Sequence, residues 1–338
     1  MAAAKTARIA FIGAGTHATE SLYPNIPQIP EFELVAVCDL DANKAEYWAR
    51  RYGARAFTEA QAMLDEVGPA GVCVVGPPEM HYEVGLQVLE RGIPVFIEKP
   101  PAPTLAGAQE LAEGARAAGT WGMVGFMKRF APANVVAKEY MASGEFQRLS
   151  SITLIHSAGP YEDLRRMLMF NGIHMIDLSR YFGGEVVELF AYAFEAEPGL
   201  RTVSVALSFA DGAVGQLNLN SGQHWRDCFE QVYISGAGAG ILIDASRTVE
   251  VMAAGRRFAA CDGLELYGWS GRYYVSGNMA GWAAGGHYTR GYWGELARFA
   301  RAVAGLEPPA PTIEDGVAAM RLIDAIIESA TSGRPLKV

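Results

Sequence analysis

Lys99 is the residue whose neighbours in the sequence most clearly suggest chemistry. It directly follows the apolar stretch PVFIE and directly precedes Pro100 and Pro101. The prolines stiffen the backbone, and a cis Lys99–Pro100 bond is accessible because only prolyl bonds adopt cis at low cost. A partly desolvated amine near another positive charge can exchange a proton with a hydroxyl at neutral pH, and in its protonated form it can stabilise an alkoxide. The alternative is a solvated lysine at the end of a strand.

A glycine-rich stretch near the N-terminus points to a dinucleotide. The stretch GAGTHA places Gly13, Gly15 and Ala18 directly after the apolar run RIAFI. The first glycine allows a tight turn, the second lets backbone approach a pyrophosphate, and the small third residue lets a helix pack on the strand. Asp39 ends a second apolar run about 20 residues later, where a carboxylate can bond the adenosine ribose. The alternative is a sheet that binds no nucleotide.

The same carboxylate bears on the choice of cofactor. Asp39 would repel a 2′-phosphate, and the next residue is Leu40 rather than an arginine that could bind one. We therefore predict NAD(H), with NADP(H) as the weaker ligand.

The first third of the chain alternates between strand and helix patterns. One helical stretch, DANKAEYWARRYG, has Asp41 as its expected cap and Gly53 as its stop. Continuous apolar strands belong to parallel sheets covered on both faces, so we predict an α/β, doubly wound Rossmann domain. Ligands of such sheets lie outside the carboxyl ends of the strands, which places Lys99 near the nicotinamide. The predicted strands are 8–13, 33–39, 71–76, 93–98 and 121–126.

The pattern changes after about residue 148. The stretches TVSVALSF and GQLNLN alternate apolar and polar residues, which is typical of an antiparallel sheet with one covered face. We expect strands in SSITLIHS, VVELFAYAF, RTVSVALSFADG, AVGQLNLNSG, FEQVYISGAG and GILIDA. Two late stretches, YWGELARFARAVAG and IEDGVAAMRLIDAIIESATSG, have helical spacing, and we expect them to pack back on the rest.

Composition limits the classes of partner. The 338 residues suffice for two domains, since single cores usually stop growing at roughly 250 residues. The formal net charge of −9 disfavours nucleic acid and anionic lipid and favours a small-molecule partner. No apolar run is long enough to span a bilayer, and the N-terminus lacks the features of a signal peptide, so we expect a cytoplasmic protein. The cysteines show no CxxC spacing; we expect buried thiols at Cys38, Cys73, Cys228 and Cys261, and no cysteine metal site.

The motifs together resemble those of the glucose–fructose oxidoreductase and inositol dehydrogenase (Gfo/Idh/MocA) family. They follow in order as IGAGTHA, VCDLD, GPPEMH, IEKPPA, GFMKRF and GIHMIDLSRYFGGEV, and the likeness extends to the C-terminal PTIEDGVAAMRLIDAIIESATSGRP. The resemblance implies a Rossmann domain over 1–126 and an α+β domain over 127–338 with a large open, mostly antiparallel sheet. It also implies an NAD(P)-dependent dehydrogenase of sugars or cyclitols, with Lys99 at the reacting hydroxyl, and a homodimer or homotetramer formed through the open sheet.

The resemblance names His174, in GIHMID, as the second catalytic candidate, because an imidazole can relay the hydroxyl proton. The alternative is a core histidine. Asp177, one turn later if the helix begins near residue 171, is expected to orient His174 or to interact with the helix dipole. The family usually carries an aspartate four residues before the histidine, where this chain has Phe170. Asn171 can bond a hydroxyl without titrating, or can cap the helix.

Further contacts follow from position and resemblance. His81, in GPPEMH, is expected near the cofactor or as a helix cap. For the cofactor we add Thr16, His17, Pro77 and Glu98. Lys128 and Arg129 are expected to meet substrate hydroxyls or to be a solvated pair. His156, together with Trp225 and His224, is expected to line the sheet face opposite the nicotinamide.

Two stretches bear on the substrate. Arg165 and Arg166, in the charged loop YEDLRRM, can clamp a phosphate or carboxylate, although solvated loop charge is the commoner case. The aromatic and glycine-rich stretch 267–293 suits a lid over a sugar or an oligomer contact. Two other functions stay open: a dinucleotide-binding regulator without turnover, and a reductase of a non-sugar substrate.

Overall fold

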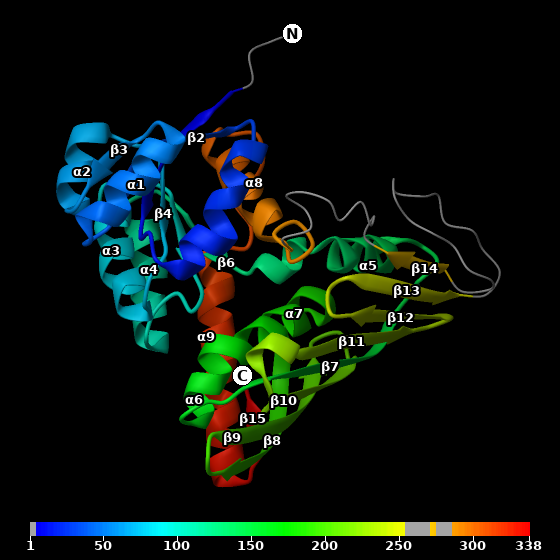
Figure 1. The fold of residues 1–338 in the computed structure, drawn as a ribbon. Coiled ribbons are helices and arrows are strands. Elements are labelled where there is room, and N and C mark those ends of the chain that lie inside the picture. The colour runs from blue at the N-terminus through cyan, green and yellow to red at the C-terminus, as the bar shows by residue number, and fades with distance from the viewer. Residues whose placement is uncertain (1–4, 254–270, 275–285) are drawn as a thin grey trace. The chain divides into compact units, whose positions relative to one another are not determined.

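The structure is a computed structural model, and it describes residues 5–253, 271–274 and 286–338. The chain divides into two compact units, which Figure 1 shows as ribbons. The first unit takes Met1–Met127 and Tyr292–Met320, and the second takes Lys128–Gly291 and Arg321–Val338. The chain therefore leaves the first unit, builds most of the second, and then returns to the first.

The first unit is built on a parallel sheet of six strands. Their order is β3-β2-β1-β4-β5-β6, which is that of a doubly wound Rossmann domain, as predicted. The strands are β1 (Ala7–Ile12), β2 (Phe32–Cys38), β3 (Arg55–Phe57), β4 (Gly71–Val74), β5 (Val95–Glu98) and β6 (Gly122–Gly125). The sequence did not predict β3, which is short and incompletely buried and so lacks a strong apolar run.

Helices pack around this sheet, and those between successive strands complete the βαβ units. They are α1 (Ala42–Tyr52), α2 (Ala60–Val67), α3 (Pro78–Glu90), α4 (Leu105–Ala117) and α8 (Tyr292–Val303), with short helical turns at Ala18–Leu22 and Tyr23–Gln28. The side chain of Asp41 accepts a hydrogen bond from the N–H of Asn43 at the start of α1. Gly53 ends the helix at φ 71°, a conformation that glycine adopts easily. The predicted cap and stop of α1 are thus confirmed.

Helix α8 returns to cover the middle of the sheet. The ring of Phe299 packs on Phe96 of β5, with ring centroids 5.8 Å apart. Gly71 on β4 leaves the space that α8 occupies, because a Cβ there would lie 2.8 Å from a methyl group of Val303. The long helix α9 (Ile313–Ser332) begins in this unit and ends in the second.

The second unit is built on a nine-stranded sheet. Its strands are β7 (Leu149–Gly159), β8 (Val186–Ala196), β9 (Leu200–Phe209), β10 (Val214–His224), β11 (Phe229–Gly236), β12 (Ala239–Asp244), β13 (Thr248–Ala253), β14 (Gly271–Tyr274) and β15 (Leu336–Lys337). Their order is β14-β13-β12-β11-β7-β10-β9-β8-β15. Neighbours pair antiparallel except β7 and β10, which are parallel. The predicted open, mostly antiparallel sheet is confirmed.

Among the described residues, helices cover one face of this sheet and leave the other face open. The helices of the unit are α5 (Pro132–Ala142), α6 (Leu164–Met167) and α7 (Ile173–Gly183), with short turns at Met127–Phe130, Leu168–Gly172 and Trp225–Asp227. Figure 1 shows α5 and α7 along one face, and α7 packs on β7 and β10. Burial alternates along β9, where Val203, Val205 and Leu207 are buried, as a half-covered sheet requires.

Two composition-based expectations have mixed outcomes. Cys38 and Cys73 are buried free thiols as predicted, but Cys228 is exposed because it precedes β11 at the end of a surface turn. Cys261 lies outside the described residues. None of the helices in the described part of the chain has both the length and the apolar character needed to cross a membrane.

Candidate active site

The loop after β1 has the shape that a pyrophosphate needs. Gly13 adopts φ 107°, and a Cβ at this position would lie 1.9 Å from the carbonyl oxygen of Val75. Only glycine permits this turn. A Cβ built at Gly15 would meet no heavy atom of the described residues within 4 Å. The backbone at Gly15 is therefore open to a ligand, and Thr16 beside it is exposed as well.

Asp39 follows β2 and joins this loop to the next. One carboxylate oxygen accepts from the N–H of Ala14 at 2.7 Å, and the other accepts from the N–H of Asp41 at 2.9 Å. Each oxygen keeps a second lone pair, so the carboxylate can also accept bonds from ribose hydroxyls. Leu40 beside it is 91% exposed. These residues fit NAD, since the two glycines make room for a pyrophosphate and a partly exposed carboxylate lies where the ribose would bind.

Lys99 lies at the carboxyl end of β5 and is half-buried. Its backbone N–H donates to the side chain of Glu98 at 3.0 Å, and Glu98 is itself buried. The Lys99–Pro100 bond is cis. Since Glu98 is bonded to the backbone of Lys99, it helps to fix the position from which the lysine side chain extends.

His81, on α3, is buried and bridges two loops. Its Nε2 accepts from the N–H of Gly76 at 3.0 Å, and its Nδ1 lies 2.8 Å from the carbonyl oxygen of Pro100, so Nδ1 carries the proton and donates. Burial lowers the pKa of His81 to about 4, which keeps the ring neutral. The bond to Gly76 caps the segment before α3, and the bond to Pro100 holds the chain one residue after Lys99.

His17 closes the other side of this region. Its Nε2 lies 3.3 Å from a carboxylate oxygen of Glu98, its ring packs on that of Tyr292 at 5.7 Å, and its side chain is 44% exposed. Pro77, at the start of α3, is exposed. The structure thus places all nine predicted cofactor residues in the first unit, around the ends of β1, β2, β4 and β5.

In the second unit, His174 is buried on α7. The helical turns begin at Leu164 and run through Leu168–Gly172 into α7, so the helix does not begin near residue 171. The N-cap alternative for Asn171 is wrong, because its amide donates to the carbonyl oxygen of Ala158 on β7 at 3.2 Å. Phe170 packs under the guanidinium of Arg166 at 5.2 Å.

Asp177 forms a two-pronged ion pair with Arg129. The guanidinium Nε and one terminal nitrogen donate to the two carboxylate oxygens at 2.9 and 2.6 Å, and Asp177 is fully buried. The helix-dipole alternative fails, because Asp177 lies within a continuous helical run and its charge is met by Arg129. The solvated-pair alternative for Lys128 and Arg129 fails as well, because Lys128 is buried and Arg129 is largely so.

Glu230 is the site residue that sequence reasoning missed. It lies directly opposite His156 where β11 pairs with β7, and its carboxylate is 3.7 Å from Nε2 of that histidine. Lys128 and Ser246 donate hydrogen bonds to this carboxylate. Burial works to raise the pKa of Glu230, but the charges of Lys128 and His156 lower it overall. Glu230 could have been found only from the register of β11 against β7, which a single sequence does not reveal.

Trp225 and its neighbour lie at an end of the same sheet. Trp225 is in the turn after β10, and its ring packs edge-on against Tyr161 with centroids 4.7 Å apart. Trp225 and His224 are exposed. The indole is therefore positioned by Tyr161 and keeps part of its surface for a ligand.

The charged stretch 161–167 is not a free anion clamp. Arg165 pairs with Asp324 on α9 at 2.8 Å, and Arg166 pairs with Glu162 at 3.3 Å. Residues 164–167 are helical rather than loop, because Asp163 caps them by accepting from the N–H of Arg166. Both arginines already have carboxylate partners, so their predicted role as an anion clamp is not supported.

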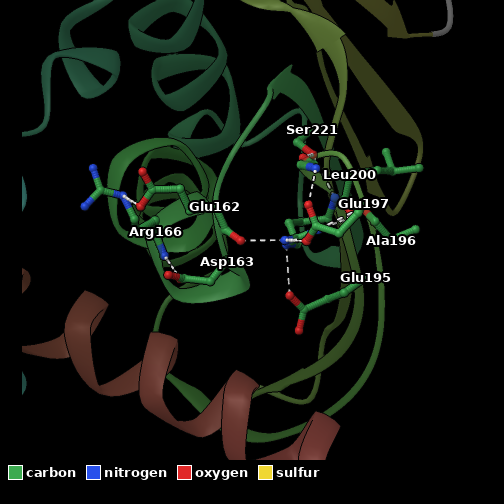
Figure 2. A network of polar contacts seen from close by, with 10 residues as sticks. Glu162, Asp163, Arg166, Glu195, Ala196, Glu197, Leu200 and Ser221 are labelled. Carbon is green, nitrogen blue, oxygen red and sulfur yellow. Dashed lines mark hydrogen bonds and ion pairs between the residues drawn. The ribbon is translucent and has the colours of Figure 1, made fainter.

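Figure 2 shows the polar network that anchors this stretch to the β8–β9 turn, with Glu162 and Asp163 on one side and Glu195 and Glu197 on the other. At its centre, the buried Arg201 forms ion pairs with Glu195 and Glu197. Its guanidinium also donates to the carbonyl oxygens of Glu162, Ala196 and Leu200. This network holds the backbone of the turn.

The aromatic stretch 267–293 falls mostly outside the described residues, and so do the predicted lid and oligomer contact within it. Its last two residues begin α8. Trp293 donates from its indole nitrogen to the carbonyl oxygen of Gln28 at 3.2 Å.

Comparison with known families identifies both parts of the chain. A model described as an oxidoreductase family with an NAD-binding Rossmann fold matches residues 7–126. A model described as an oxidoreductase family C-terminal alpha/beta domain matches residues 167–338. The predicted cofactor, NAD, is thereby confirmed.

Individual proteins match over different lengths of the chain. An inositol 2-dehydrogenase of Rubrobacter xylanophilus is 29% identical over 331 residues, which covers 92% of this chain and 87% of that protein. A D-glucoside 3-dehydrogenase of Escherichia coli is 33% identical over 196 residues, covering 52% and 54%. The solved structure of a levoglucosan dehydrogenase in complex with NADH and L-sorbose has a TM-score of 0.82 at 21% identity, covering 98% and 99%, and so shares the fold.

Proposed function

From the premise that the chain belongs to the Gfo/Idh/MocA family of NAD-binding oxidoreductases, we propose that it oxidises a secondary alcohol of a sugar, cyclitol or sugar derivative, or reduces the matching ketone. The observation that carries the proposal is the position of Lys99. It lies at the carboxyl end of β5, on the edge of the sheet where the open loop at Gly15 follows β1. The names of the inositol and glucoside dehydrogenases support the substrate class.

In this proposal the chain binds the dinucleotide through Gly13, Gly15 and Asp39. NAD, when bound, supplies the acceptor for the hydride that leaves the carbinol carbon. Thr16, His17 and Pro77 would make further contacts around it. His81 and Glu98, which both bond the backbone next to Lys99, would hold the lysine in place for the bound cofactor.

Side chains of the protein then accept and donate the proton of the reacting hydroxyl. Oxidation of a carbinol removes one hydride and one proton, and we assign the hydroxyl proton to Lys99 and His174. Lys99 in its neutral form accepts the proton, or in its charged form stabilises the alkoxide, and the imidazole of His174 relays the proton. In the reverse direction the same groups return the proton to the ketone oxygen.

The substrate residues are proposed on the second unit. Asn171, His156 and Trp225 can bond or stack on hydroxylated rings. Arg129 and Asp177, which pair with each other in the structure, would act mainly by positioning α7 and its His174. Because this chain has Phe170 where the family usually has an aspartate, the grip on the substrate would depend on amide and imidazole groups rather than on that carboxylate.

We also propose that the open face of the nine-stranded sheet pairs with a second copy of this chain. Large apolar side chains lie on that face, among them Tyr192, which is 71% exposed, and Phe194, which is 58% exposed. Around them lie uncharged polar residues such as Gln216 and Asn218, so two copies could pair without burying many charges. Light scattering should show an oligomer that the double substitution Tyr192→Glu and Phe194→Glu dissociates; an unchanged mass would refute this interface.

The test of the function is a substrate panel. The absorbance of reduced nicotinamide is followed with NAD and NADP in parallel, against inositols, free aldoses, glycosides, sugar phosphates and non-sugar ketones. Turnover with one polyol class and NAD supports the proposal. Turnover with non-sugar ketones alone would favour the non-sugar reductase, and dinucleotide binding without any turnover would favour the regulator.

A further inference from the structure

Glu295 is a buried carboxyl group to which none of the roles above gives a function. It lies on α8, in the first unit, and is fully buried. Neither of its carboxyl oxygens has a hydrogen-bond partner among the described residues. An ionised carboxylate in such a place would cost several kcal/mol or more, so the group needs a physical explanation.

The packing of α8 turns Glu295 toward Glu98. Phe299 of α8 packs on Phe96 of β5. Glu98 is two residues after Phe96 and so on the same face of the strand, and Glu295 is four residues before Phe299 and so on the same face of the helix. At the start of α8, Tyr292 packs on the ring of His17, which itself contacts Glu98.

The sheet leaves room for this arrangement. Gly125 on β6 pairs with Glu98 across the strands, and a Cβ at Gly125 would lie 2.9 Å from the carboxyl carbon of Glu98. Since glycine occupies that position, the Glu98 side chain can extend over the strand within the covered layer. Glu98 and Glu295 thus share an apolar layer between the sheet and α8.

The charges of the neighbours distinguish the two carboxyl groups. Burial and the negative charge of Glu98 raise the pKa of Glu295 well above its usual value, against the opposing charge of Lys99. Burial also works to raise the pKa of Glu98, but the pull of His17, Lys99 and His81 lowers it overall. The groups that face the pair are His17, Cys73, His81 and Lys99. These opposite shifts favour an ionised Glu98 and a protonated Glu295.

We propose that Glu295 and Glu98 form a carboxyl pair that holds one proton behind Lys99, and that His17 connects this pair to solvent. Glu295 is a positioning residue in this scheme. In its neutral form it adds no second negative charge to that of Glu98 near Lys99. His17 suits its part, since its ring contacts Glu98 on one side and is 44% exposed. The effect on Lys99 rests on the proposed function, whereas the protonation of the pair does not.

The proton on the carboxyl pair is tested without any enzyme assay. Glu295→Gln has nearly the same shape and cannot ionise, and Glu113→Gln, at an exposed position on α4, is the matched control. Folding of the wild-type chain takes up a proton that the Glu295→Gln chain does not need. Denaturant unfolding should therefore show the wild type losing stability relative to Glu295→Gln by about tenfold in the folding constant per pH unit above the ordinary glutamate pKa. Parallel pH dependences would overturn the proposal.

A second measurement does not depend on a variant that folds. Infrared spectra of the wild-type protein with isotope-labelled glutamate should show a protonated carboxyl band at neutral pH, and its absence would overturn the proposal. For Lys99, the pH at which kcat rises should stay the same in Glu295→Gln, because the wild-type side chain is already neutral, and the KM for NAD should not change. A profile that moves to lower pH in Glu295→Gln would show that the wild-type Glu295 is charged beside Lys99 and would refute the link to Lys99; a protein without turnover would instead refute the proposed function.

Discussion

The imidazole of His81 donates from Nδ1 to the carbonyl oxygen of Pro100 at 2.8 Å, one residue beyond Lys99. Through its other nitrogen the same ring holds Gly76, so one buried side chain ties the end of β4 to the end of β5. The proposed catalytic lysine therefore extends from a backbone that two side chains, His81 and Glu98, hold in position.

His81 should make the protein sensitive to acid. Its pKa is lowered to about 4 in the folded chain from an ordinary 6.5, so the unfolded chain binds the proton first as the pH falls. The stability that the neutral ring contributes is complete above pH 6.5 and is lost toward pH 4, by about 3 kcal/mol in all. Denaturant unfolding of His81→Gln across this range should show a weaker loss, and an equally steep loss in the variant would contradict the assignment.

Alanine substitutions at Gly13 and Gly15 should have different effects on stability. Gly13→Ala forces a Cβ toward the carbonyl of Val75 and a strained φ, so we expect a loss of stability of about 2 kcal/mol or more. Gly15→Ala meets open space, so its stability should change by no more than about 0.5 kcal/mol while the new methyl group weakens NADH binding. Thermal unfolding and NADH fluorescence titration check both. Equal stability of the two variants would contradict the role given to the turn at Gly13.

Asp39 should set the preference for NADH. Asp39→Ala removes the ribose acceptor and the bond to the Ala14 N–H, so NADH affinity should fall by about tenfold or more. The affinity for NADPH should fall less, because the substitution also removes the repulsion between the Asp39 carboxylate and the 2′-phosphate. Asp41→Asn, which keeps a helix cap at the neighbouring position, is the control and should bind NADH as the parent does. An unchanged ratio of the two affinities in Asp39→Ala would contradict this role.

Local signals were enough to predict the first unit. The apolar strands and the cap and stop of α1 each depend on residues close together in the chain, and the structure confirms them. Strand β3 was not predicted, because its three residues are not fully buried and show no clear apolar pattern in the sequence.

Long-range relationships could not be predicted. Glu230 meets His156 only through the register of β11 against β7, and Glu295 faces Glu98 only because α8 returns to the first sheet. Asn171 was misjudged as a possible cap because the irregular turn at Leu168–Gly172 continues the helix where a start was expected. Each of these positions depends on tertiary packing, which overrides the local pattern.

The central claim, that Lys99 handles the proton of the reacting hydroxyl, is tested most directly by Lys99→Ala on the substrate that the panel identifies. Turnover should fall by about a thousandfold, the usual contribution of a positioned proton-transfer group, while the Kd for NADH stays within a few-fold of the parent value. Turnover within a few-fold of the parent, with NADH still bound, would contradict the account.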